Sequence, residues 1–243
     1  YKDQQVYDIQ ILSTLGLTKN DINEISKIEG IEKAIGTYET DGKLEIGKKE
    51  IVSKVLCLEE INTPKLLEGN LPQNEDECVV EKSFLEFNNK KIGDTIELEI
   101  EKSKDKDGNE IEYLKNNKLK IVGIAQSPMY ISGDRGNSKI GAGKVNYYLY
   151  VNKNNINATD IYTNIYIKVE DANKYTTSKN DYKEVVENTK NKIEEIKEER
   201  EQARKDELVE CATKKLQEAE NEFNSQKAEA NNKITEAEQK IAD

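Results

Sequence analysis

The sequence predicts an α+β fold with a βαβ-containing lobe, a small β-rich lobe and a long helical arm at the C-terminus. The first 60 or so residues alternate between strand-like and helix-like patterns, and the middle of the chain holds short strand-like runs at regular spacing. The last quarter has no Gly and no Pro, and about half of its residues are charged, which favours one helix. We therefore expect lobes at 1–62 with 160–180 and at 63–159, and an arm at 178–243.

The first lobe is expected to open with a strand at residues 6–12 and a helix that begins at Thr18. Thr18 and Asp21 have the spacing of a capping box, and Gly30 is expected to end the helix. Alternation predicts that three side chains of the first strand share a face. These are Tyr7, Ile9 and Ile11.

Further strands are expected around two turn signals, Asp41-Gly42 and Gly47. Asp41-Gly42 is expected to separate a strand at 31–40 from a second at 43–58, which completes a β-α-β-β unit. A loop at 64–72 is bounded by Pro64 and Pro72. The remaining expected elements are strands at 77–81, 95–101, 118–125, 145–151 and 164–169, a helical turn near 83–87 and a polar hairpin at 102–117.

The arm is expected to be a helix from Ser178, capped by Ser178 and Asp181, with an apolar seam of coiled-coil spacing. Two polar residues, Arg200 and Gln226, interrupt this seam. A solvated single helix is the alternative, but we favour packing against a second helix, either a returning segment of the same protein or another chain. If arms pair in register, Cys211 would suit cross-linking. The seam residues are Ile193, Ile196, Ala203, Leu208, Ala212, Leu216, Ala219, Phe223, Ala230, Ile234, Ala237 and Ile241.

Composition excludes several classes of function. The net charge of −11 disfavours nucleic-acid binding, because such a surface repels phosphate. No run approaches the roughly 18 apolar residues that a membrane span requires. Met129 is the only Met, so we expect the chain to be a piece of a longer protein.

Neither a metal site, nor a cofactor site, nor a catalytic site is expected. The chain has no His, so a Ser or Cys nucleophile lacks its usual base, and the Cys residues form no zinc-like cluster. Cys57 and Cys78 are expected as buried thiols, with a disulfide between them as the alternative. Residues 105–109 suit a type I′ turn better than a calcium loop. Residues 136–144 lack the pattern of a phosphate-binding loop.

Five segments, in order along the chain, carry a family resemblance. Residues 17–32, 67–80, 92–96, 119–124 and 127–144 resemble the extracytoplasmic core domain of MacB/FtsX-like ABC transporter permeases, in particular a Gram-positive subgroup with a coiled-coil insertion. Asn70 departs from the Arg usual in this family.

This resemblance implies a domain on the extracellular face of the cell membrane. Its expected partners are the permease's transmembrane helices and a cytoplasmic ATPase subunit, with a permease homodimer and an extracellular protein docked on the coiled coil as further partners. The implied role is non-catalytic transmission of ATP-driven movement, in lipoprotein or peptide export or in cell-wall hydrolase regulation. The alternative is a stand-alone structural or adhesion module that oligomerises through its arm.

Binding residues are expected in the loop that precedes residue 145, because binding functions concentrate in loops. A purely structural turn is the alternative. The candidate interaction residues are Pro128, Met129, Tyr130 and Arg135.

Overall fold

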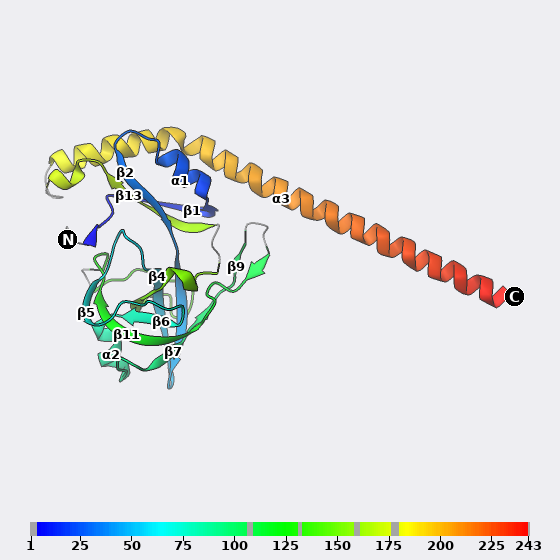
Figure 1. Ribbon diagram of the computed structural model, residues 1–243, viewed down its shortest axis with the longest axis horizontal. Coiled ribbons are helices and arrows are strands. Elements are labelled where there is room, and N and C mark those ends of the chain that lie inside the picture. The colour runs from blue at the N-terminus through cyan, green and yellow to red at the C-terminus, as the bar shows by residue number, and fades with distance from the viewer. Residues whose placement is uncertain (1–3, 106–108, 131–132, 158–160, 176–179, 243) are drawn as a thin grey trace. The chain divides into compact units, whose positions relative to one another are not determined.

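The computed structural model describes residues 4–105, 109–130, 133–157, 161–175 and 180–242 (Figure 1). The chain consists of two units, Tyr1–Lys197 and Glu198–Asp243. The helices are α1 (Lys19–Ile25), α2 (Lys82–Asn88), α3 (Asn180–Ala242) and the short 3₁₀ segments η2 (Lys153–Asn155) and η3 (Ala172–Lys174). The strands are β1 (Ile9–Leu17), β2 (Ile31–Thr37), β3 (Glu39–Ile46), β4 (Lys49–Cys57), β5 (Lys65–Gly69), β6 (Glu77–Val80), β7 (Thr95–Glu97), β8 (Glu99–Ile100), β9 (Ser103–Lys104), β10 (Glu110–Ile111), β11 (Lys118–Gln126), β12 (Tyr147–Val151) and β13 (Tyr162–Val169).

The smaller sheet has three antiparallel strands in the order β1-β13-β2 (Figure 1). The late strand β13 lies between the first two strands of the chain and pairs with both. Ile165 and Ile167 of β13 are fully buried in a cluster with Leu17 and Ile25. The first turns of α3 pack against this cluster through Tyr182, Val185, Val186, Ile193 and Ile196.

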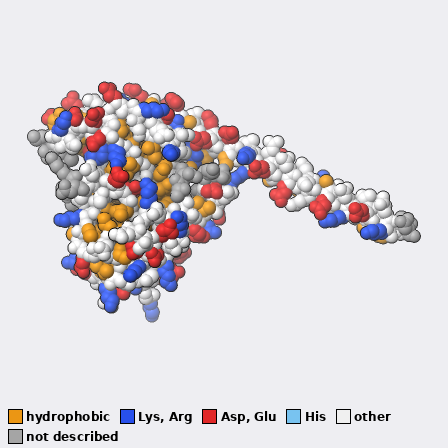
Figure 2. Space-filling model, in the orientation of Figure 1, with side chains coloured by type: hydrophobic (Ala, Val, Ile, Leu, Met, Phe, Trp, Pro, Cys, Tyr) orange, Lys and Arg blue, Asp and Glu red, His pale blue; other side chains and the backbone are white. Residues whose placement is uncertain are grey.

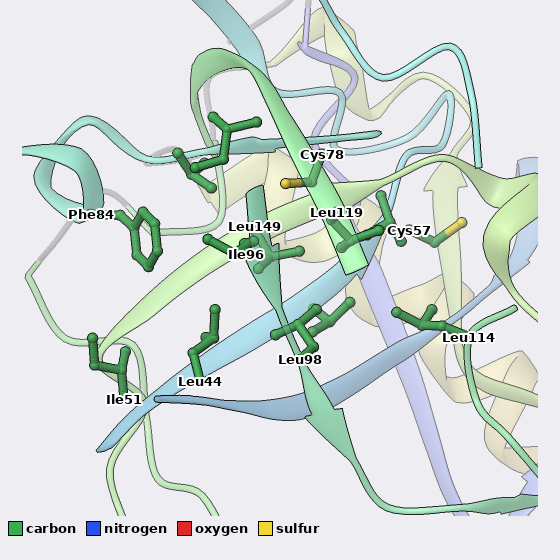
Figure 3. Packing of buried hydrophobic residues seen from close by; sticks show 14 of the residues in the cluster. Leu44, Ile51, Cys57, Cys78, Phe84, Ile96, Leu98, Leu114, Leu119 and Leu149 are labelled. Carbon is green, nitrogen blue, oxygen red and sulfur yellow. The ribbon is translucent and has the colours of Figure 1, made fainter. Parts of the chain in front are cut away.

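The larger sheet has eight strands, in the order β5-β11-β6-β12-β4-β3-β8 with β7 also paired to β11. Leu44, Ile96 and Leu119, from three different strands, meet in one buried cluster with Phe84 of α2 (Figure 3). Cys57 and Cys78 are free thiols buried in the same cluster, which confirms the first expectation for them.

The two-lobe division stays a prediction. β4, expected in the first lobe, pairs in parallel with β12 from the segment expected in the second, with Tyr147 beside Ser53. β3 and β4 therefore belong to the larger sheet, although they directly follow β2 of the smaller one.

The predicted turn at Asp41-Gly42 is wrong, because both residues lie inside β3. The strand break falls at Tyr38, where the chain leaves the smaller sheet for the larger. A Cβ at Gly42 would lie 2.9 Å from Leu98 Cδ2 and 3.1 Å from Val55 Cγ2. The glycine thus suits close packing across the strand rather than a turn.

The helix expected up to Gly30 ends earlier, at Ile25, with Ser26 as its C-cap. The Ser26 hydroxyl donates to the Ile22 carbonyl at 2.7 Å, and the next backbone bonds are of the tighter i to i+3 kind. The predicted capping box of Thr18 and Asp21 is confirmed.

Three other expectations need correction. Tyr7 does not share a face with Ile9 and Ile11; it precedes β1 and stacks on Tyr166 at 5.1 Å, on the opposite side of β13 from Ile165. The loop expected at 64–72 contains β5, which pairs with β11.

The strand expected at 95–101 is split into β7 and β8, which pair with different strands, β11 and β3. The turn expected at 105–109 and the Ser178 cap include residues outside the described part of the chain. The residues that flank the expected turn do pair, as β9 and β10.

Candidate functional site

The loop between β11 and β12 begins at a buried serine that two tyrosines hold in place. Ser127 donates its backbone N–H to the Tyr148 hydroxyl at 3.0 Å, and its own hydroxyl lies 2.7 Å from that of Tyr150. Tyr148 and Tyr150 are two residues apart on β12 and therefore share one face of the larger sheet. This face, which also carries Leu56, Val79 and Ala125, is covered by the loop.

The next three residues of the loop link the two sheets. Pro128 is buried, whereas Met129 and Tyr130 are half-buried. The Met129 sulfur accepts a weak hydrogen bond from Tyr166 of the smaller sheet at 3.8 Å. Tyr130 stacks on Tyr148 of the larger sheet, with ring centres 5.2 Å apart. The loop therefore makes a bridge between β12 and β13.

Arg135 is held by an ion pair with a buried carboxylate. Its Nε donates to Glu81 Oε1 at 2.7 Å and its Nη2 donates to Glu81 Oε2, a two-pronged contact. The guanidinium also lies 5.7 Å from the centre of the Tyr148 ring. These bonds to Glu81 are the main cause of the raised pKa of Arg135. Only about 5% of Glu81 is exposed, so this carboxylate is shielded from solvent.

Glu81 has two further donors. The Ser83 hydroxyl donates to Glu81 Oε2 at 2.7 Å, and the Tyr148 backbone N–H donates to Oε1 at 3.2 Å. The carboxylate thus joins α2, β12 and the loop. Further along the loop, Ser138 donates to Asp41 at 2.6 Å, and Asp41 also pairs with Lys54.

The tyrosines around this loop keep their protons at neutral pH. Burial raises the pKa of Tyr130, Tyr150 and Tyr166 well above the ordinary value, and the nearby Glu39 carboxylate raises each further. Such hydroxyls donate and accept hydrogen bonds but do not act as bases. The arrangement holds the loop and both sheets together, which matches the structural alternative for Pro128, Met129, Tyr130 and Arg135; their role as a binding site stays a prediction.

Sequence reasoning missed the residues that hold this loop. Glu81 is the acid that ends the apolar run of β6, and Tyr148 and Tyr150 alternate in a recognisable strand pattern. These two signals could have indicated a buried acid and a tyrosine-lined face. The sequence offers no signal that pairs Glu81 with Arg135, 54 residues away.

Helix α3 divides into two parts by its surroundings. Its first turns belong to the domain core: Tyr182 donates to Asp8 at 3.0 Å, and Ile193 and Ile196 pack against the smaller sheet. These two isoleucines were predicted as seam residues, but their apolar surface is used within the domain. Beyond residue 198, large apolar side chains are exposed, and the coiled-coil seam stays a prediction. The exposed apolar residues of this distal part are Leu208, Val209, Leu216, Phe223, Ile234 and Ile241.

Comparison with known proteins shows no match to a family model or to a curated protein. The chain is similar to the extracellular domain of the noncanonic ABC-type transporter YknZ from Gram-positive bacteria (10% identity, 67% of this chain and 78% of the other, TM-score 0.40). It is also similar to the periplasmic region of MacB from Actinobacillus actinomycetemcomitans (16%, 75% and 76%, 0.39). A third similar structure is a domain assigned to a permease protein of Porphyromonas gingivalis (18%, 69% and 70%, 0.34).

This is the class of domain that the sequence motifs resemble. Within the described residues, no helix is long and apolar enough to cross a membrane.

Elsewhere on the described part of the chain, a hollow of about 230 Å³ lies beside β3 and β7. It is smaller than a typical ligand pocket, and its lining contains two acidic residues, Glu45 and Glu97, and two basic residues, Lys90 and Lys118. No group of three or more acidic or Cys side chains among the described residues is placed to hold a metal ion. Figure 2 shows acidic and basic side chains interspersed over the visible face, without a large area of one sign.

Proposed function

We propose that this chain is a non-catalytic extracellular domain of an ABC transporter permease subunit. Its role is to transmit movements driven by ATP hydrolysis on a separate cytoplasmic subunit to an extracellular partner or substrate. The five ordered sequence segments support the family. The alternation of β1, α1 and β2, with β13 completing their sheet, is compatible with it.

The anchoring of α3 is the observation that carries the mechanical part of the proposal. The helix is continuous for 63 residues. Its first turns contact the chain just before each of the two edge strands of the smaller sheet: Tyr182 bonds to Asp8 before β1, and Lys192 pairs with Glu29 before β2 at 2.8 Å. A displacement of this sheet would therefore move the helix with it, and a continuous helix relays motion better than a flexible linker.

The loop between β11 and β12 has a matching role in this proposal. Because Tyr130 contacts β12 and Met129 contacts β13, the loop couples the two sheets. Movement applied to either sheet then reaches the first turns of α3 through these side-chain contacts as well as through the backbone that connects the sheets. Cargo release, peptide export and hydrolase activation are all outputs that such a device can serve.

The experiment tests whether helix continuity is required in the full-length protein. A flexible Gly-Ser insertion of about seven residues after Lys197 is expected to leave ATP hydrolysis intact but to prevent complementation of a deletion strain. The matched control is an insertion of the same length made of Ala, Glu and Lys, which extends the helix by about two turns and is expected to retain function. Equal function of both variants would refute transmission through the helix.

A separate measurement tests the location. Ser225 is exposed, so a Ser225→Cys variant of the full-length protein can be labelled with a membrane-impermeant maleimide in intact cells. Labelling before permeabilisation is expected. Labelling only after permeabilisation would refute the extracellular location. This result does not depend on the helix insertion, so the location and the transmission through the helix can fail separately. Recovery of the protein without any ATPase subunit or membrane would instead favour the stand-alone module.

A further inference from the structure

The distal part of α3 carries a regular heptad pattern that differs from the seam first predicted only in its start, at Val209 instead of Leu208. From Val209 to Ala230 the heptad a and d positions alternate in steps of three and four residues. All of these positions are apolar except the d position Gln226. Val209 is 64% exposed and was missed because Leu208 precedes it. The a positions are Val209, Leu216, Phe223 and Ala230, and the d positions are Ala212, Ala219 and Gln226.

The pattern continues after one irregular step. Ala230 is followed by Ile234 after four residues instead of three, an insertion that coiled coils accommodate by local unwinding. Ile234 and Ile241 then take a positions, with Ala237 at d. The large side chains of this stripe are 56% to 85% exposed.

This distal stripe is distinct from the stripe that packs on the domain. The predicted seam contains a step of five residues, from Ala203 to Leu208. On an α-helix a step of five turns the next position by about 140°. Ile193 and Ile196, which pack on the smaller sheet, therefore lie on a different helix face from Leu216 and Phe223.

Charged residues on both sides of the distal stripe identify its partner. In a parallel, in-register two-stranded coiled coil, each g residue faces the e residue five positions later on the other chain. Three such pairs join two charged residues, and all three are of opposite sign. They are Lys215 with Glu220, Glu222 with Lys227, and Lys233 with Glu238.

The other g positions bring no like charges together. Leu208 faces Thr213, and Glu229, which pairs with Lys233 of its own helix at 2.5 Å, faces the apolar Ile234 after the irregular step. By contrast, the antiparallel register that pairs Phe223 with Gln226 brings Glu222 opposite Glu229 twice, which offsets the attraction of Glu220 for Lys227 in the same register. Charge complementarity thus favours the parallel arrangement.

We propose that residues 209–241 form a parallel, in-register coiled coil with the same segment of a second copy of this chain. The interface is the stripe of a and d residues, and the three g–e pairs, each formed twice, fix its orientation and register. Two Gln226 side chains meet in the middle at a d position and hydrogen-bond across the interface. The inference rests on the helix alone, so it holds or fails independently of a transporter role.

The first test measures the self-association of the whole chain by sedimentation equilibrium. Glu222→Lys sets lysine against Lys227 at two places in the dimer and is expected to raise the dimer dissociation constant about tenfold. The double variant Glu222→Lys with Lys227→Glu restores opposite charges and is expected to return it to near the original value. Glu218→Lys, the same charge change at an outward c position, is the matched control and is expected to have little effect.

The second test fixes the orientation by disulfide formation, in a Cys211→Ser background. Ala219→Cys places two thiols side by side at a d layer of the parallel dimer and is expected to give a cross-linked dimer on mild oxidation. The antiparallel register sets Ala219 against Ala230 and would not. Asn224→Cys, on the outward b position, is the control that is expected to form no disulfide-linked dimer under the same conditions.

A monomer at every concentration would overturn the proposal and would favour a returning helix of the same protein as the partner. A dimer that tolerates Glu222→Lys, or that forms no disulfide through Ala219→Cys, would also overturn it. The helix content of each variant is measured by circular dichroism. Unchanged helix content shows that weaker association does not result from loss of the helix.

Discussion

Replacing Arg135 by Met tests whether the loop between β11 and β12 is held by its buried ion pair. Arg135 is the only charged donor that the structure gives to Glu81 among the described residues, and its side chain is about 15% exposed. Removing one partner of a buried pair typically costs 3–5 kcal/mol, because the remaining charge is left uncompensated.

The expected cost lies at the lower end of that range. Glu81 retains the Ser83 hydroxyl at 2.7 Å and the Tyr148 N–H at 3.2 Å, and Met fills part of the space over the Tyr148 ring. We therefore expect Arg135→Met to reduce the free energy of unfolding by about 3 kcal/mol. For a domain of this size, that corresponds to a loss of roughly 6–12 °C in melting temperature.

Tyrosine fluorescence is a suitable assay, since the chain has 12 Tyr and no Trp, and Tyr130 and Tyr148 stack beside Arg135. It reports on the domain rather than on the helical arm, which would dominate circular dichroism. Lys115→Met is the control, because Lys115 pairs with Glu75 at 2.9 Å on the exposed surface and should cost less than about 1 kcal/mol. Equal urea midpoints for the two variants would refute the reasoning.

Three further substitutions give expected outcomes in urea titrations. Thr18→Ala removes the cap of α1 and should cost about 1 kcal/mol; no loss would mean that the capping box adds nothing. Gly123→Ala sets a Cβ 2.6 Å from the Asn70 carbonyl and should cost about 1–3 kcal/mol, unless β5 separates from β11 without penalty. Burial and Asp8 raise the pKa of Tyr182 to about 12, so its stabilising effect is complete below pH 10 and lost as the pH rises towards 12. Tyr182→Phe should therefore lose less stability than the original chain between pH 10 and 12; parallel curves would contradict this.

Local features of the fold could be read from the sequence, because the physics that sets them acts over a few residues. The capping box needs only Thr18 and Asp21, three positions apart, and it forms as expected. The sheet assignment of β3 could not be read in this way. Asp41-Gly42 has the chemistry of a turn, yet Gly42 is inside a strand because it pairs with Ser53 of β4 and with Ile100 of β8, which is 58 positions later in the chain.

The candidate site shows the same limit. A loop was correctly expected between β11 and β12, but the contacts that fix it come from Glu81 before α2, from β12 and from β13. Arg135 was predicted to contact a binding partner because Glu81, the carboxylate with which it pairs, lies 54 residues away in the chain. The predicted seam of α3 joined residues from two helix faces for a related reason. Steps of three, four and five residues look alike in the sequence, although a step of five places the next side chain on another face of the helix.

The two faces of α3 predict two separable defects. Ile193 packs in the core beside the smaller sheet, so Ile193→Ala should destabilise the domain by about 1–2 kcal/mol, less than for a fully buried site. Phe223 is 64% exposed, so Phe223→Ala should change the unfolding free energy by under about 0.5 kcal/mol while weakening self-association. If Phe223→Ala unfolded the domain, or Ile193→Ala weakened the dimer without affecting stability, the division into two stripes would be wrong. The helix would then act as one seam, and folding and assembly would be a single event.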